Sequence, residues 1–179
     1  MKIFRKLGVK EMSFEEFRKR IAFNFIHFYN GVIRIFSQEL DKIFFRVIRS
    51  NDQPKPFPGI KESLDFLRNK EIKLAVLSYH LQEELERDIK DWRFQGLFID
   101  RESNVKNKKR AIIRLMRRNN FKPEETIYFG DMVLDIRAGK KAGVKTVAVS
   151  WGYQPRDKLR KAKPDFLIDN PSEIKRIIL

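Results

Sequence analysis

Short apolar runs alternate with amphipathic stretches from residue 57 to the end of the chain. The runs are rich in Ile, Leu, Val and Phe, and they predict strands at 72–77, 97–100, 126–129, 146–150 and 166–168. The stretches between them repeat apolar residues every three or four positions and predict helices at 60–67, 81–92, 111–118, 135–142 and 171–178. Strands that alternate with helices predict an α/β fold, with a parallel sheet covered on both faces.

The first 56 residues have a different pattern, in which mostly aromatic residues recur at helical spacing. Ser13 is a predicted N-cap, and Glu16 completes a capping box three residues later. The helix face that follows consists of Phe14, Phe17, Ile21, Phe25, Phe28 and Val32. His27 is expected to pack within this helix, and residues 40–48 predict a second one. Because residues 54–59 contain three prolines and a glycine, we divide the chain into a helical region, 1–56, and an α/β core, 57–179.

Composition excludes several kinds of protein and site. The 179 residues are 42% apolar and include 16 Phe, enough to bury a sizeable core. The absence of cysteine excludes disulfides, thiolate metal sites and cysteine nucleophiles. No stretch reaches the roughly 20 uncharged apolar residues of a membrane span, and the amino terminus lacks a signal-like apolar run, so we expect a cytoplasmic protein. The abundance of Lys, Glu and Ile is typical of a thermophile's composition.

Three predicted strand ends carry candidate functional residues, because ligands bind beyond the carboxyl ends of strands in such sheets. Asp131 and Asp135 follow the strand at 126–129 and offer the hard oxygen ligands that magnesium prefers, or they cap the next helix. Ser78 follows the strand at 72–77 and either binds a phosphate oxygen or acts as an N-cap. The basic stretch 106–110 either neutralises a phosphate or forms a solvated surface.

Together, these features resemble the haloacid-dehalogenase-like hydrolase superfamily, in the style of its phosphoglycolate phosphatase branch. The segments that carry the resemblance are 57–64 (FPGIKESL), 73–78 (KLAVLS), 122–131 (KPEETIYFGD), 138–144 (AGKKAGV) with 151–153 (WGY), and 164–169 (PDFLID). The resemblance covers residues 57–179. It implies a Rossmann-like parallel sheet with helices on both faces, together with a small all-helical cap in region 1–56.

The resemblance also assigns roles to individual residues. It implies that Asp131 binds Mg²⁺ with support from Asp135, and that Ser78 binds the phosphoryl group. It implies a lysine before the next helix, for which Lys106 fits one spacing and Lys108 another. We favour Lys108 because it lies four residues before Ile112, near the helix start. Relatives usually have a small polar residue after the serine, so Tyr79 and His80 are candidate substrate contacts that depart from the pattern.

One part of the family pattern is missing from the sequence. The resemblance implies a first motif, Asp-x-Asp-Gly-Thr, whose first aspartate attacks phosphorus and whose second is the general acid and base. The 179 residues contain no Asp-x-Asp, and no strand is predicted before the helical region. The first core strand, which lies in the middle of the family's sheet, is therefore expected to be missing. Three explanations stay open: an amino-terminally shortened chain, a natural fragment completed by another chain, or a degenerate relative whose residues 1–5 fill the gap.

The sequence thus supports two hypotheses of different kinds. The first is a Mg²⁺-dependent phosphomonoester phosphatase that acts on a small phosphorylated substrate and is inactive as this chain, because the nucleophile is absent. The second is a non-catalytic interaction protein that uses the net charge of +15 to bind a polyanion such as nucleic acid, or that forms a homo-oligomer or pairs with a partner chain. Residues 106–118 hold seven basic residues and no acidic one, yet a nucleic-acid module also needs stacking platforms or a groove-reading helix. Some of these charges are expected to rim the strand-end site.

Overall fold

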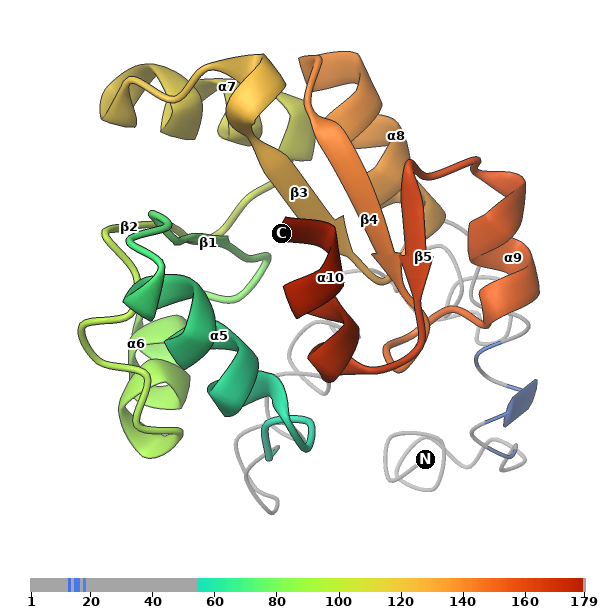
Figure 1. Cartoon of the computed structure of the whole chain (residues 1–179), viewed down its shortest axis with the longest axis horizontal. Helices are drawn as coiled ribbons and strands as arrows, with labels where there is room; N and C mark the ends of the chain where they lie inside the picture. Colours follow the sequence, from blue (N-terminus) through green and yellow to red (C-terminus); the bar gives the residue numbers. More distant parts are fainter. Residues whose placement is uncertain (1–12, 14, 17, 19–54, 179) are drawn as a thin grey trace, which may run out of the picture.

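A computed structural model of the chain describes residues 13, 15, 16, 18 and 55–178. The helices of residues 55–178 are α5 (Ile60–Asn69), α6 (Gln82–Asp91), α7 (Lys108–Asn119), α8 (Val133–Ala142), α9 (Arg156–Lys161) and α10 (Ile174–Ile178), with 3-10 turns at Pro123–Glu125 and Pro171–Glu173. The strands are β1 (Ala75–Leu77), β2 (Asp100–Glu102), β3 (Ile127–Gly130), β4 (Lys145–Val149) and β5 (Phe166–Ile168). Figure 1 shows the strands alternating with helices, as the α/β prediction requires.

All strand pairs in this part of the chain are parallel. β1 pairs with β2, in register Ala75 to Asp100, and β3–β4–β5 form a second sheet in which Ile127 lies opposite Lys145. Within residues 55–178, no strand joins β1 to β3. This separation matches the expectation that the strand between them is missing.

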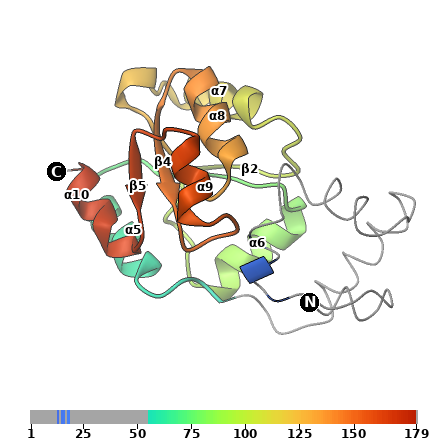
Figure 2. The same cartoon turned by 90° about the vertical axis from the view of Figure 1, so that its right-hand side faces the viewer.

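Strand β4 is the centre of the core, and its alternate residues face opposite helical layers. Val147 and Val149 pack with Leu67 of α5 and Ile174 of α10. Ala148 packs on the other face with Ile136 of α8 and Leu159 of α9. Figures 1 and 2 show the same arrangement, with α5 and α10 on one side of the sheet and α8 and α9 on the other. This two-residue alternation follows from the geometry of a strand buried on both faces.

The two sheets lie in one layer, because β1 and β3 share neighbours on both faces. On one face, the residues Leu74, next to β1, and Phe129 of β3 both pack against the cluster around Leu67 and Val147. On the other face, Leu77 and Tyr128 both pack against Ile112 and Met116 of α7, together with Ala138 of α8. Within residues 55–178, the edges of β1 and β3 that have no partner strand therefore belong to the same interrupted sheet.

Most predicted elements are confirmed with small shifts at their ends, and β5 has its predicted bounds. The prediction at 97–100 is wrong for most of its length, because β2 runs from Asp100 to Glu102. Leu97 packs into a cluster with Leu85, Ile89 and Phe94 as part of a turn. The paired strand that follows is polar and lies at the edge of its sheet. A search for apolar runs therefore does not detect it. Helix α9 was not predicted.

The capping box at the start of the chain is confirmed within the described residues. The Glu16 N–H donates to Ser13 Oγ at 3.1 Å, and the Ser13 N–H donates to Glu16 Oε2 at 3.0 Å. Glu15, Glu16 and Arg18 are helical. The rest of the predicted helical cap, including His27, and the gap-filling role considered for residues 1–5 lie outside the described residues. The division at residue 56 stays a prediction.

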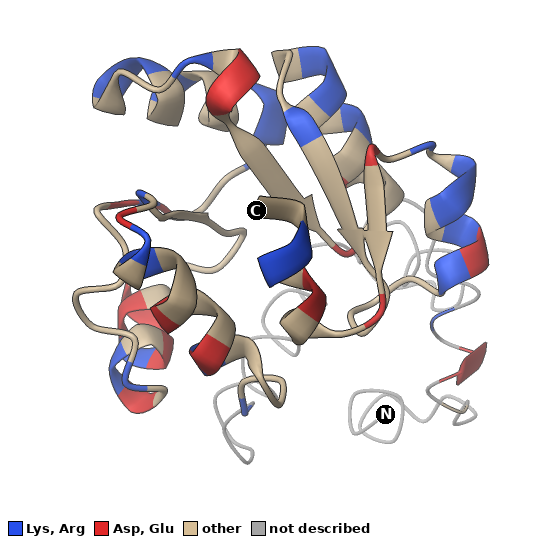
Figure 3. Ribbon diagram, in the orientation of Figure 1, with Lys and Arg blue, Asp and Glu red and all other residues tan. Residues whose placement is uncertain are grey.

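The positive charge gathers on one part of the core. Figure 3 shows Lys and Arg concentrated on α7, α8 and α9, while Asp and Glu are frequent on α5 and α6. Lys140 and Lys141 occupy the last turn of α8, and Lys145 begins β4. These three lysines lie at the amino edge of the sheet, opposite the strand ends, so they do not rim the site.

Candidate active site

Asp131 and Asp135 follow β3 at its carboxyl end, where the chain turns into α8. A Cβ added to Gly130 would lie only 2.1 Å from the Cβ of Asp135, so the glycine provides room for the carboxylate. Gly130 is not among the glycines with positive φ, and close approach, rather than an unusual backbone angle, explains it.

Asp135 is buried and both of its carboxylate oxygens have partners. Its Oδ1 forms an ion pair with Lys108 Nζ of α7, and the Tyr128 hydroxyl lies 3.5 Å from the same oxygen. Its Oδ2 accepts a hydrogen bond from the Met132 N–H at 3.1 Å. Asp135 therefore caps α8, as one of the two sequence interpretations held, and at the same time it pairs with Lys108, the favoured one of the two candidate lysines.

Asp131 lies beside this pair in a partly buried setting. Its Oδ2 accepts a hydrogen bond from the Tyr153 N–H at 2.8 Å. Burial raises the pKa of the Asp131 carboxyl above its usual value, and the Tyr153 hydrogen bond opposes that shift. The negative charge of Asp135 also raises this pKa, whereas the positive charge of Lys108 lowers it. Asp131, Asp135 and Lys108 thus form one electrostatic group.

The loop after β4 completes the surroundings of Asp131, and sequence reasoning missed its role. A Cβ added to Gly152 would lie 2.2 Å from Asp131 Oδ2 and 2.3 Å from its Cβ, so the loop packs directly on the aspartate. The fully buried Gln154 donates its N–H to the Asp131 carbonyl at 3.2 Å, and its Oε1 accepts from the Val133 N–H at 2.7 Å. The Trp151-Gly152-Tyr153 segment was noted only as part of the family pattern.

Ser78 lies at the end of β1 in a loop that is held by residues 102–105. Its N–H donates to the Glu102 carbonyl at 2.9 Å, and its carbonyl accepts from the Val105 N–H at 3.0 Å. Its Oγ accepts a hydrogen bond from the His80 N–H at 3.1 Å. Because Oγ is the acceptor in this contact, the hydroxyl proton can still be donated to a ligand. The N-cap interpretation of Ser78 is therefore wrong, because the N-cap of α6 is Leu81, and the phosphate-binding interpretation stays a prediction.

Tyr79 and His80 point to different partners. The Lys108 ammonium lies 4.7 Å from the centre of the Tyr79 ring, within the range of a cation–π contact. His80 Nδ1 lies 3.4 Å from Asp88 Oδ2, a buried carboxylate of α6. The structure thus places Tyr79 against Lys108, and it places His80 against α6.

The structure separates the two candidate lysines. Lys108 is the first residue of α7, whose N-cap Asn107 accepts a hydrogen bond from the Arg110 N–H. The side chain of Lys108 is 15% exposed and that of its partner Asp135 is 2% exposed. Lys106 is exposed, and within the described part of the chain no ion pair joins it to a carboxylate. Only Lys108 of these two therefore reaches the site.

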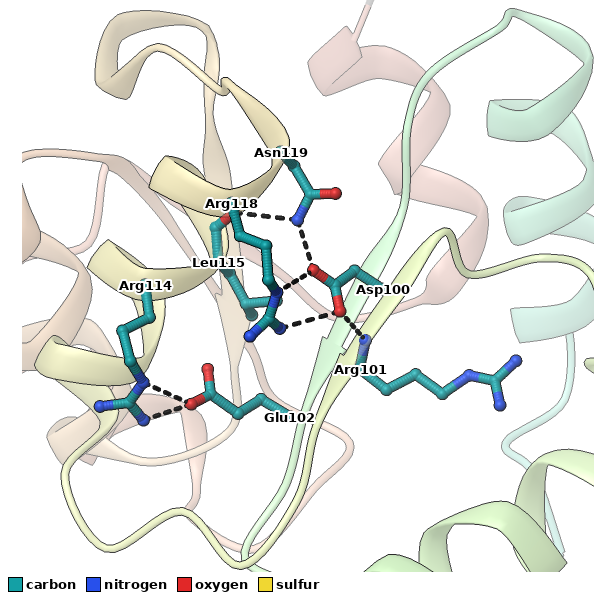
Figure 4. A network of polar contacts seen from close by, with 7 residues as sticks. All are labelled: Asp100, Arg101, Glu102, Arg114, Leu115, Arg118 and Asn119. Carbon is teal, nitrogen blue, oxygen red and sulfur yellow. Dashed lines mark hydrogen bonds and ion pairs between the residues drawn. The ribbon is translucent and has the colours of Figure 1, made fainter.

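Helix α7, which carries Lys108, is attached to β2 by polar contacts at its other end (Figure 4). Arg118 donates to both carboxylate oxygens of Asp100, at 2.6 and 2.8 Å, and Asn119 donates to Asp100 as well. Arg114 makes a second pair with Glu102. Together, these contacts join α7 to β2.

The metal prediction can be compared with the ligands present. Among residues 55–178 and the four described earlier ones, no three His, Asp or Glu side chains gather closely enough to hold a metal ion. Both oxygens of Asp135 are engaged by the chain, which leaves Asp131 as the carboxylate placed to bind a cation. The described residues therefore fit one ligand of Mg²⁺ and not a whole site.

A sequence profile described as "Haloacid dehalogenase-like hydrolase" matches residues 1–149. The chain belongs to this family. A phosphoglycolate phosphatase from Synechococcus elongatus is 31% identical over 120 residues, which cover 66% of this chain and 57% of that protein. A phosphoglycolate phosphatase from Aquifex aeolicus is 28% identical, over 99% of this chain and 85% of the relative. A pyrophosphatase from Bacillus mycoides is 30% identical over 68% of this chain and 59% of its own length. The chain thus spans less than two thirds of the first and third of these relatives.

Solved structures confirm the fold. A haloacid dehalogenase-like hydrolase from Streptococcus pneumoniae superposes with a TM-score of 0.85 at 17% identity, over 99% of this chain and 87% of that one. A haloacid dehalogenase-like protein from Agrobacterium tumefaciens gives 0.79 at 17% identity, over 99% and 86%. No helix among the described residues has the length and apolar character needed to cross a membrane.

Proposed function

We propose that this chain is the phosphoryl-binding part of a phosphomonoester phosphatase that acts on a small phosphorylated substrate. The observation that carries the proposal is the buried ion pair between Lys108 and Asp135, next to Asp131 at the strand ends. A lysine neutralised by one carboxylate and adjacent to a second suits a centre that handles a doubly charged phosphoryl group. The phosphatase relatives support the same class of substrate.

Each residue has a proposed role in binding. The Ser78 hydroxyl donates its proton to a phosphoryl oxygen, and the Lys108 ammonium neutralises a second oxygen while Asp135 holds the lysine in place. Tyr79 and His80 lie beside the serine and contact the rest of the substrate. Asp131 supplies one oxygen ligand to Mg²⁺, which when bound would neutralise charge on the phosphoryl group.

Hydrolysis needs a nucleophile that the printed sequence does not contain. In the proposed reaction, a carboxylate of an Asp-x-Asp segment attacks phosphorus, and the alcohol leaves with a proton from the second aspartate. Water then cleaves the aspartyl phosphate to free phosphate and restores the carboxylate. The unpaired edges of β1 and β3 are where such a strand would fit. We therefore propose that the 179-residue chain binds phosphate but does not turn substrate over by itself.

The test is hydrolysis of p-nitrophenyl phosphate in the presence of Mg²⁺. We expect no turnover by the 179-residue chain. We expect turnover when an amino-terminal strand that ends in Asp-x-Asp-Gly-Thr is fused before Met1, and none when both aspartates of that strand are replaced by Asn. Turnover by the unextended chain would overturn the claim about the nucleophile. A folded but inactive fusion would overturn the proposed phosphatase function.

The other predictions made from the sequence stay untested. These are binding of a polyanion by the basic helices α7–α9, homo-oligomer formation, a complementing chain and a cytoplasmic location. Salt-sensitive retention of the chain on heparin, measured alongside phosphate binding, would favour the polyanion interpretation over the phosphatase.

A further inference from the structure

The loop 150–154 is held to the candidate site by its N–H groups. Tyr153 donates to Asp131 Oδ2 at 2.8 Å, and Gln154 donates to the Asp131 carbonyl at 3.2 Å. The position of Asp131 therefore depends on a loop that follows it by about twenty residues. Whatever fixes this loop also fixes the carboxylate.

The carbonyl groups of the same loop converge on one side chain from the beginning of the sequence. The Arg18 guanidinium donates to the Ser150 carbonyl at 2.6 Å, to Gln154 at 3.1 Å and to Tyr153 at 3.3 Å. These contacts join positions 132 to 136 residues apart. The N–H side of the loop thus faces Asp131, while three of its carbonyls face Arg18.

Arginine suits this position for a physical reason. Three carbonyl oxygens that approach one another repel, and a planar cation with several N–H donors can satisfy all of them at once. A lysine ammonium is a point donor on a flexible stem and cannot reproduce this arrangement. Arg18 is also set by its own helix, because Ser13 and Glu16 form the capping box one turn earlier.

The loop has a second anchor on its far side, which isolates what Arg18 contributes. Ser150 donates its N–H to the Ile168 carbonyl at 3.1 Å, and its hydroxyl donates to Asp169 Oδ1 at 2.5 Å. Ser150 is thus tied to the end of β5 without Arg18.

We infer that Arg18 is a positioning residue for the candidate active site. It holds the loop 150–154 so that the Tyr153 N–H stays on Asp131, and it thereby ties the amino-terminal helical residues to the metal-binding carboxylate. The part of this inference that concerns Mg²⁺ rests on the proposed function. The contacts of Arg18 with the loop do not depend on the proposed function.

Amide hydrogen exchange, resolved residue by residue by NMR, tests the inference on the 179-residue chain. In R18M we expect exchange at Tyr153 and Gln154 to accelerate about 10-fold or more, since hydrogen bonds to charged groups contribute about 1.5–3 kcal/mol. Exchange at Val147 and Ala148 in β4, which reports global unfolding, should accelerate by no more than exchange at Tyr153 does. R18K should show an intermediate acceleration at Tyr153.

The matched control is R117M, because Arg117 is exposed on α7 and no described side-chain contact involves it. It should leave all four amides at wild-type rates. Unchanged exchange at Tyr153 in R18M would overturn the inference, as would an acceleration at the β4 amides that exceeds the one at Tyr153 in both R18M and R18Q. R18Q keeps one amide group as a donor, and it provides the measurement if R18M does not fold.

A second readout separates this inference from the proposed function. In the fusion that carries the Asp-x-Asp strand, R18M should raise the Mg²⁺ concentration for half-maximal hydrolysis about 10-fold, as loss of outer contacts typically does. An unchanged Mg²⁺ requirement would overturn the link to the metal. If the wild-type fusion is inactive, the proposed function fails, and exchange at Tyr153 still decides whether Arg18 positions the loop.

Discussion

The ammonium of Lys108 and the carboxylate of Asp135 form a buried ion pair that joins the first turn of α7 to the first turn of α8 across 27 residues. The two groups come from different helices, and each also touches another site residue, Tyr79 for the lysine and Tyr128 for the aspartate. The charge at the strand ends is therefore a shared property of α7, α8 and the loop after β1.

Replacing Lys108 by Met should lower the free energy of unfolding by about 3 kcal/mol. The substitution leaves the buried Asp135 carboxylate without its cation, and loss of one partner of a buried pair costs about 3–5 kcal/mol. Urea unfolding at pH 7 measures the effect.

Lys106→Met is the control for this measurement, because the residue is exposed and close in sequence. It should change the free energy of unfolding by less than about 0.5 kcal/mol. Equal losses in the two variants would contradict the choice of Lys108 over Lys106.

Replacing Gly152 by Ala should lower the free energy of unfolding by about 2 kcal/mol or more. The new methyl group would lie 2.2 Å from Asp131 Oδ2, so either the loop or the carboxylate must move. The same variant should accelerate amide exchange at Tyr153, whose N–H bonds to that oxygen.

Gly96→Ala is a useful comparison, since Gly96 has a φ of +75° and no atom within 4 Å of the added Cβ. Its cost should be limited to backbone strain of about 1 kcal/mol, with normal exchange at Tyr153. If Gly152→Ala were as stable as Gly96→Ala, the loop 150–154 would accommodate the methyl group by a small shift, which would contradict the prediction.

Acid should weaken the attachment of α7 to β2. The hydrogen bond from Arg118, with smaller help from Asn119 and the Arg101 N–H, lowers the pKa of Asp100 to about 2. A carboxyl whose pKa is lower in the folded state stabilises the fold above its unfolded pKa of about 4, and loses that contribution as the pH falls toward 2. Asp100→Asn should therefore remove part of the decline in stability between pH 4 and pH 2.

Arg118→Met removes the main cause of this shift and should flatten the same part of the pH profile, whereas Arg117→Met should retain the wild-type profile. Urea midpoints at pH 4, 3 and 2 provide the comparison. A wild-type pH profile in both Asp100→Asn and Arg118→Met would refute the assignment.

The sequence by itself determined the order of most strands and helices after residue 57, because their periods of two and of three to four residues are local. It located the capping box at Ser13 and the bounds of β5 for the same reason. It also predicted that no strand joins β1 to β3 within residues 55–178, since the family's first motif is missing from the sequence.

Tertiary structure decided what depends on contacts between distant residues. β2 is polar, and only its pairing with β1 identifies it as a strand. Lys106 and Lys108 are equivalent in a basic run until the packing of α7 on α8 brings one of them to Asp135. Arg18 has no distinguishing neighbours in the sequence, and its role arises because folding brings the carbonyls of residues 150, 153 and 154 to its guanidinium. A sequence pattern records local periodicity, whereas a binding site is made by residues that meet only when the chain folds.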